Sequence, residues 1–170
     1  MSHHHIICNN VSFSYEKDTE ILHEINFTAG HDDAIGLIGA NGVGKSTLLR
    51  ILVGLEMGFT GEVTVGEIKI TKKTLPRIRE KIGYVFQDSE NQLFMPTVYE
   101  DIAFAPRNYG LDAEQVDERV MHALKLIGIE YLRNKQPYKM SGGEKKLAAI
   151  ATILAMTPDV IIMDEPTIAL

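Results

Sequence analysis

Residues 34–53 read AIGLIGANGVGKSTLLRILV. An apolar run at 34–38 leads into Gly39–Ser46, which matches the pattern G-x-x-x-x-G-K-[ST] in full. Glycines let the backbone wrap a phosphate closely, and the positive end of the following helix adds to the attraction. Lys45 supplies a charge for the terminal phosphates, and the Ser46 hydroxyl can ligate Mg²⁺. A glycine-rich turn with a chance lysine is the alternative, but the pattern and its context favour a nucleoside triphosphate site.

An acidic pair follows a second apolar run, Val160–Met163. A continuous apolar run is typical of a strand buried on both faces of a parallel sheet. Asp164 and Glu165 come next, where ligands bind in α/β sheets, so Asp164 can hold Mg²⁺ and Glu165 can orient or deprotonate water. A solvated strand end and a small-molecule kinase are the alternatives at this point.

A third pattern, Ser141-Gly142-Gly143-Glu144, precedes a long helix with an apolar face. Ser141 with Glu144 is an ordinary capping box. Such a box needs no glycines, and each glycine costs the helix roughly 0.5–1 kcal/mol against alanine. The glycines leave an open helix N-terminus that can bind an anion, and we infer that it serves the nucleotide of a neighbouring subunit.

Composition narrows the class of protein. The 170 residues are 45% hydrophobic and 24% charged, with a net charge of −6, which disfavours a nucleic-acid binder. A single cysteine, Cys8, excludes an internal disulfide. The longest strongly apolar stretch, Leu147–Met156, has ten residues, and roughly 20 are needed to cross a bilayer. Any membrane role is therefore predicted to be peripheral. His3-His4-His5 is either a metal-binding tract or a vector-derived start, and no function is assigned to it.

The order of expected elements predicts an α/β core that is interrupted by helices. The expected strands are Ile6–Phe13, Glu24–Thr28, Ala34–Ile38, Glu62–Val65, Ile82–Phe86 and Val160–Met163. The expected helices are Lys45–Val53, Val98–Phe104, Ala113–Ile127 and Gly142–Met156. Thr97 with Glu100 fits a capping box, and Asp112 with Gln115 fits a looser one.

Taken together, the motifs resemble those of ATP-binding cassette (ABC) ATPases. The phosphate loop, Gln87 after Gly83–Phe86, the Ser-Gly-Gly-Glu segment and the Asp-Glu-Pro-Thr ending occur in that family's order. Tyr15 resembles the aromatic residue that stacks on adenine. The resemblance covers essentially all of the chain from Ile6 to Leu170.

The resemblance implies a head-to-tail dimer with two sandwiched ATP molecules. The implied ATP-binding residues are Tyr15, Gly39, Ala40, Asn41, Gly42, Val43, Gly44, Lys45, Ser46, Thr47 and Gln87. The residues implied to bind the partner's ATP are Ser141, Gly142, Gly143 and Glu144. Glu165 is the implied catalytic residue, and the implied Mg²⁺ ligands are Ser46, Gln87 and Asp164.

A narrower resemblance, to the energy-coupling-factor and cobalt-uptake branch, is carried by residues 86–94, 97–104 and 142–146. It implies an ATPase on the cytoplasmic face of the cell membrane that powers import of a metal ion or a vitamin. The implied partners are a second ABC ATPase subunit and an integral membrane subunit, one helix of which enters a groove near Gln87 and Gln92, with no nucleic acid. A soluble ABC-type switch and a non-hydrolysing regulatory module are the alternatives.

The implied fold is a P-loop NTPase (RecA-like) core with a small antiparallel β subdomain and a helical subdomain. We expect the core and β subdomain in 1–87 and 145–170, and the helical subdomain in 88–144. All six histidines precede Asp164, so the family's switch histidine and the C-terminal part of the core are expected to be missing. The core strand expected between the phosphate-loop strand and the Asp164 strand would then be absent, so we expect these residues alone to bind ATP weakly, hydrolyse little and aggregate.

Overall fold

The computed structural model describes residues 5–16, 19–87 and 92–165. His3, His4, residues 88–91 and the Pro-Thr pair after Glu165 were part of the sequence predictions and lie outside the described residues. The chain divides into two compact units, Met1–Ile82 and Gly83–Leu170.

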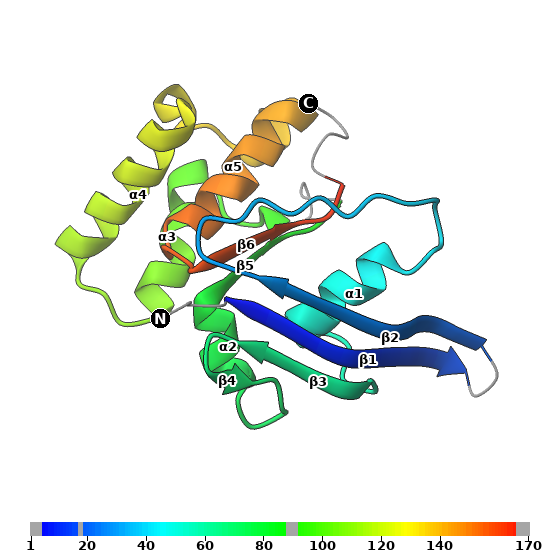
Figure 1. The fold of residues 1–170 in the computed structure, drawn as a ribbon. Helices are drawn as coiled ribbons and strands as arrows, with labels where there is room; N and C mark the ends of the chain where they lie inside the picture. The colour runs from blue at the N-terminus through cyan, green and yellow to red at the C-terminus, as the bar shows by residue number, and fades with distance from the viewer. Residues whose placement is uncertain (1–4, 17–18, 88–91, 166–170) are drawn as a thin grey trace. The chain divides into compact units, whose positions relative to one another are not determined.

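The first unit is built on a four-stranded sheet with the order β2-β1-β3-β4 (Figure 1). Its strands are β1 (Ile6–Glu16), β2 (Thr19–Ala29), β3 (Thr60–Val65) and β4 (Ile68–Lys69). All neighbouring strands are antiparallel, as expected for the small β subdomain. The predicted strand at Glu24–Thr28 was too short, because β2 pairs with β1 from Thr19 onward.

A register shift in β1 decides which side chains face the core. Ile6 and Cys8 are buried, and so are Val11 and Phe13, which lie in the opposite phase of the alternation. Asn10 lies between the two pairs with φ 50°, and the pairing with β2 shifts there. A bulge adds one residue and turns the following side chains to the other face. Both apolar pairs therefore reach the core, and burial raises the pKa of the Cys8 thiol to about 12.

Two helices complete this unit, α1 (Lys45–Leu52) and α2 (Leu75–Lys81). The first was predicted and the second was missed. Only Ile78 of α2 is buried, so the segment shows no apolar periodicity. Pro76 is compatible with a helix start, because the first turn needs no proline N–H, and this was the available signal.

The expected strand at Ala34–Ile38 is wrong. The described structure has no regular element there, and the Ile38 side chain is 99% exposed. A strand exists only through the backbone pairs it makes with a neighbour. No described strand pairs with this segment, so its apolar sequence is not sufficient to make it a strand.

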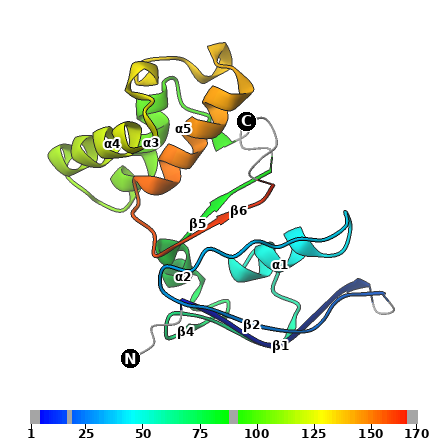
Figure 2. The same cartoon turned by 45° about the horizontal axis from the view of Figure 1, so that its top comes forward.

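The second unit contains a two-stranded sheet and three helices. The strands are β5 (Ile82–Val85) and β6 (Val160–Met163), which run side by side in the same direction (Figure 2). The helices are α3 (Val98–Asn108), α4 (Ala113–Ile127) and α5 (Gly142–Leu154), with 3-10 turns η2 (Glu130–Leu132) and η3 (Pro137–Lys139) between the last two. The three helices share one apolar core.

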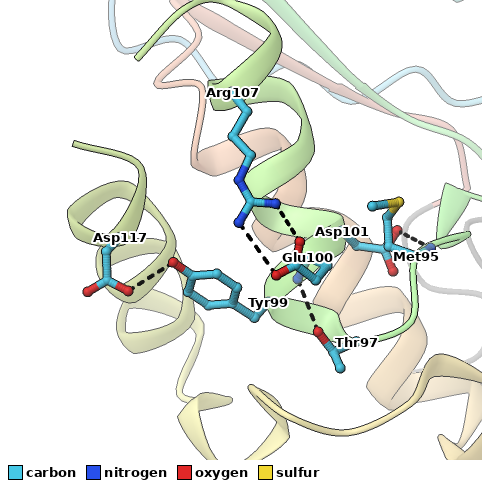
Figure 3. Close-up of polar contacts among 7 residues, drawn as sticks. All are labelled: Met95, Thr97, Tyr99, Glu100, Asp101, Arg107 and Asp117. Carbon is cyan, nitrogen blue, oxygen red and sulfur yellow. Dashed lines mark hydrogen bonds and ion pairs between the residues drawn. The ribbon is translucent and has the colours of Figure 1, made fainter. Parts of the chain in front are cut away.

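The helix starts follow the predicted caps with one difference. Asp112 and Gln115 form a complete capping box at α4, although their pattern was the looser one. At α3, Thr97 accepts from the Glu100 backbone N–H, but the Glu100 carboxylate pairs with Arg107 instead of returning to Thr97 (Figure 3). The hydrogen bond from Arg107 lowers the pKa of Glu100. The ion pair of Glu100 with Arg107 therefore links the first and third turns of α3.

Candidate functional site

The phosphate-binding pattern lies at the start of α1. Gly44 is the residue before the helix, with φ 98° and no side-chain cap. The first helical hydrogen bond runs from the Leu48 N–H to the Gly44 carbonyl (2.9 Å). The N–H groups before Leu48 thus lie at the open, positive end of the helix dipole. Such a start suits an anion.

Two glycines of the loop are required by its backbone. Gly42 has φ 81° and Gly44 has φ 98°, both in the left-handed region. A methyl group on Gly44 would also lie 2.9 Å from side-chain carbons of Ile21 and Leu22 in β2. The loop therefore packs directly on the sheet, and only glycine fits at position 44.

Lys45 folds back over this loop. Its ammonium group donates to the carbonyls of Gly39 and Ala40, each at 2.8 Å. Asn41 and Val43 between them are exposed. A phosphate would offer the lysine charged acceptors in place of neutral carbonyls, which makes a stronger hydrogen bond. The chain's own carbonyls hold the lysine at the mouth of the loop.

Tyr15, the predicted adenine-stacking residue, lies beside the same helix. Its hydroxyl is 3.4 Å from the Thr47 hydroxyl in the first turn of α1, and 3.4 Å from the Glu56 carboxylate. Its ring makes an edge contact with Phe13 and is 52% exposed. The structure thus brings an accessible aromatic face to the predicted phosphate site within the first unit. Glu56 was missed, and nothing in its sequence context indicated this contact.

The carboxyl ends of β5 and β6 bring three predicted residues of the second unit together. The Asp164 N–H donates to the Val85 carbonyl (3.0 Å), which fixes the pairing of the two strands. The Gln87 amide then donates to the Glu165 carboxylate at 2.5 Å. A methyl on Gly83 would lie 2.0 Å from Ile153, so α5 packs directly against β5 behind these residues.

Asp164 is buried, and its carboxylate accepts from the Tyr84 hydroxyl at 3.2 Å. Asp164 and the Gln87 amide offer oxygen ligands, as Ser46 does in the first unit, and oxygen is the donor type that Mg²⁺ prefers. The donor set therefore fits Mg²⁺ in its chemistry. Among the described residues, no group of three histidine, cysteine, aspartate or glutamate side chains is clustered as a metal site.

Glu165 is held at two points. Its backbone has φ 51°, which is uncommon for a residue with a side chain. Besides the bond from Gln87 to its carboxylate, its carbonyl accepts from the Lys146 ammonium at 3.1 Å. Lys146 lies on α5 and is buried. No role was predicted for Lys146, although its position one helical turn before the buried Ala149 was an available signal.

The start of α5 is satisfied by side chains. The Glu144 N–H donates to the Ser141 hydroxyl (3.2 Å), and the Ser141 N–H donates to the Glu144 carboxylate (2.8 Å). Lys135 donates to both oxygens of that carboxylate, at 2.8 and 3.0 Å, and this hydrogen bond lowers the pKa of Glu144. Lys135 was also missed, because it lies outside the helix and nine residues away.

Gly142 at this helix start has no described neighbour that requires glycine. A methyl group on Gly142 would meet no described residue within 4 Å, and Gly142 is exposed. Gly143 follows it on the same turn. The packing of the described residues therefore gives no reason for glycine at position 142, in contrast to Gly44.

Asp101 of α3 holds the two residues Phe94 and Met95 that precede the helix. Asp101 accepts from the backbone N–H groups of Phe94 and Met95, both at 2.9 Å. Figure 3 shows the bond from Met95. Its other oxygen is buried without a hydrogen-bond partner among the described residues, and burial raises the pKa of Asp101. Phe94 is 65% exposed and makes an edge contact with Phe104. Asp101 therefore fixes the backbone at Phe94, whose ring forms an exposed apolar surface with Phe104.

Gln92 connects that segment to β5. Its amide accepts from the Phe86 N–H (3.2 Å) and donates to the Tyr84 carbonyl (3.3 Å). Its side chain is therefore engaged within the chain, while the rings of Phe86, Phe94 and Phe104 are exposed.

Comparison with known proteins gives a consistent family. A family profile described as "ABC transporter" matches residues 22–168. A putative ABC transporter ATP-binding protein of Geobacter sulfurreducens is 46% identical over 170 residues, covering 100% of this chain and 68% of that protein. The energy-coupling factor transporter ATP-binding protein EcfA of Methanoculleus marisnigri is 46% identical over 167 residues, covering 98% of this chain and 60% of that protein. The chain spans about half to two thirds of the length of such relatives.

Solved structures give the same result for the fold. The structure of cbiO1 from Clostridium perfringens, described as part of the ABC transporter complex cbiONQ, matches with a TM-score of 0.91 at 37% identity, over 98% of this chain and 67% of that one. An ATP-binding cassette described as a dimer in a post-hydrolysis state, bound to ADP and Pi, matches with a TM-score of 0.83 at 30% identity, over 97% of this chain and 75% of that one. The predicted α/β nucleotide-binding fold class is confirmed. No helix among the described residues is long and apolar enough to span a membrane.

Proposed function

This chain belongs to the ABC transporter family, and on that premise we propose that it is the ATP-binding and hydrolysing part of a transporter of the energy-coupling-factor type. Its import substrate would be a metal ion or a vitamin. The observation that carries the proposal is the start of α1, where a glycine-bounded helix end has no side-chain cap and Lys45 lies over the loop.

The proposed ATP site uses the residues named from the sequence. Residues Gly39 to Thr47 would bind the phosphates, and the exposed ring of Tyr15 beside Thr47 would stack on adenine. Mg²⁺, held by Ser46, Asp164 and Gln87, would neutralise charge on the phosphates.

Glu165 is the proposed general base. Its carboxylate would accept a proton from the attacking water. Gln87 would orient this carboxylate, because the Gln87 amide nitrogen lies 2.5 Å from a carboxylate oxygen of Glu165. A contact of Gln87 with the γ-phosphate would then affect the position of the Glu165 carboxylate through this hydrogen bond.

The second nucleotide contact is proposed to come from a partner ATPase. Gly142 is exposed, and no described residue of its own chain gives a steric reason for glycine there, which supports close approach of another molecule. Ser141, Gly142, Gly143 and Glu144 would then bind the ATP held by the partner's phosphate loop. ATP would close the dimer, and hydrolysis would reopen it.

The integral membrane subunit is proposed to dock near Phe94 and Phe104. Their exposed rings contact each other; Phe104 lies on α3, and the Phe94 backbone is hydrogen-bonded to Asp101 of the same helix. An apolar, ordered surface suits a helix of a partner. The protein would then lie at the cytoplasmic face of the membrane. For domain organisation we propose a core with its β subdomain in 1–87 and 145–170, and a helical subdomain in 88–144.

Replacement of the base tests the proposal. In the full-length protein, Glu165→Gln is expected to keep ATP binding and to lower kcat by about 100-fold or more, the usual contribution of general acid–base catalysis. Glu118→Gln, an exposed α4 residue, is the matched control. ATPase rates and nucleotide affinity measured on both variants test whether Glu165 is the general base. Turnover that survives in Glu165→Gln would show that the base is another group.

A further inference from the structure

A buried lysine outside the predicted site contacts the proposed base. Lys146 is 2% exposed, and its ammonium donates to the backbone carbonyl of Glu165 at 3.1 Å. Burial of an ammonium group is costly unless it is compensated by hydrogen bonds or charges. The other buried residues of α5, Ala148, Ala149 and Ala151, are small and apolar. A lysine among them is therefore retained for what its charged end contacts.

The contact is made where the backbone is strained. Glu165 has φ 51°, a conformation that costs a residue with a side chain roughly 1–2 kcal/mol. Such a conformation persists only where the surroundings hold it. Among the described residues, the Gln87 amide contacts the Glu165 carboxylate and Lys146 contacts the Glu165 carbonyl. The side-chain contact alone leaves the backbone of Glu165 free to relax, and the backbone contact removes that freedom.

We propose that Lys146 is a positioning residue for ATP hydrolysis. It holds the main chain of Glu165 in the left-handed conformation and thereby directs the carboxylate toward the attacking water. The inference rests on the proposed role of Glu165. Lys146 would act through the backbone of Glu165 and would not contact the nucleotide or the attacking water. Its loss is therefore expected to lower kcat and to leave nucleotide binding unchanged.

The test compares three variants in the full-length protein. Lys146→Met keeps the length and the apolar stem and removes the donor, and Lys146→Arg keeps a charged donor. Lys125→Met, at an exposed position in the last turn of α4, is the matched control. We expect kcat to fall about tenfold or more in Lys146→Met, because small misplacements of a catalytic group are costly. KM and the ATP dissociation constant should stay within about threefold.

Rescue and non-additivity separate positioning from general support of the fold. Lys146→Arg should recover most of the lost kcat. In the Glu165→Gln background, Lys146→Met should cause no further loss of kcat, because both changes act through one carboxylate. If Lys146→Met does not fold, Lys146→Gln replaces it, with an intermediate kcat and an unchanged KM expected.

Results that contradict the role of Lys146 can be told apart from a result that contradicts the proposed ATPase function. Unchanged kcat in Lys146→Met, or KM rising in parallel with the loss of kcat, would overturn the role of Lys146 and leave the proposed ATPase function intact. A wild-type protein that binds ATP without turnover would overturn the proposed function, and the role of Lys146 with it.

Discussion

The starts of α1 and α5 use the same sequence device in different ways. Both place glycine at a helix N-terminus, where backbone N–H groups can bind an anion. At α1 no side chain caps the helix, and Lys45 is held by loop carbonyls. At α5 a complete capping box of Ser141 and Glu144 is reinforced by Lys135.

The reasons for the glycines differ too. Gly44 is fixed by its left-handed φ and by contact with β2, so the fold of its own unit requires it. A methyl group on Gly142 would meet none of the described residues within 4 Å. A glycine at a helix start can therefore reflect either internal packing or the approach of a second molecule, and the two cases are separable by experiment.

Among changes at the two helix starts, the largest effect is expected for Gly44→Ala. The methyl group would meet Ile21 and Leu22. The loop would also hold the alanine at a left-handed φ, at a cost of about 1–3 kcal/mol. The phosphate loop should move to relieve it. Chemical denaturation should show the loss of stability, and ATP affinity measured by titration should fall about tenfold or more. Wild-type affinity in Gly44→Ala would contradict the packing argument.

A smaller and more selective effect is expected for Gly142→Ala. Stability should be unchanged or higher by up to about 0.5 kcal/mol, because alanine is the better helix former and the site is open. Binding of ATP to the same chain should be unaffected. ATPase activity of the dimer should fall about tenfold, since the methyl group would obstruct the partner's nucleotide. Full activity in Gly142→Ala would show that this helix start faces no ligand.

The smallest effect is expected for Lys135→Met, and it should depend on pH. The hydrogen bond from Lys135 lowers the pKa of Glu144 below its ordinary value of 4.5. A lowered pKa in the folded state contributes stability above pH 4.5, and that contribution is lost as pH falls through the lowered value. The urea midpoint of Lys135→Met should therefore lie below that of the wild type at pH 7, and the two should converge as pH falls below the lowered pKa of Glu144. Lys125→Met is the control, and a difference that is constant with pH would contradict this origin.

Local sequence signals predicted most of the helices of the second unit. The predicted bounds of α4, Ala113–Ile127, are confirmed, because Asp112 caps its start and Gly128 ends it with φ 75°. The prediction for α3 ended at Phe104, but the helix runs to Asn108 through Pro106. A proline removes one N–H and does not always end a helix in its last turn.

The candidate site was predicted unevenly. The patterns around Lys45, Glu165 and Ser141 were visible because each is a short run of adjacent residues. Lys135 and Lys146 were not, since their contacts join segments 9 and 19 residues apart. The roles assigned to the individual ATP- and Mg²⁺-binding residues stay predictions.

The sequence by itself determined the family, the capping residues that begin α3, α4 and α5, and the places where glycine-rich helix starts and carboxylates occur, because these depend on neighbouring residues. Only the tertiary structure decided that 34–38 is not a strand, that the Gly44 position excludes any side chain, and that Lys146 reaches the carbonyl of Glu165. Strand pairing, steric exclusion and long-range hydrogen bonds depend on what lies beside a residue in space, and spacing along the chain carries no direct record of that.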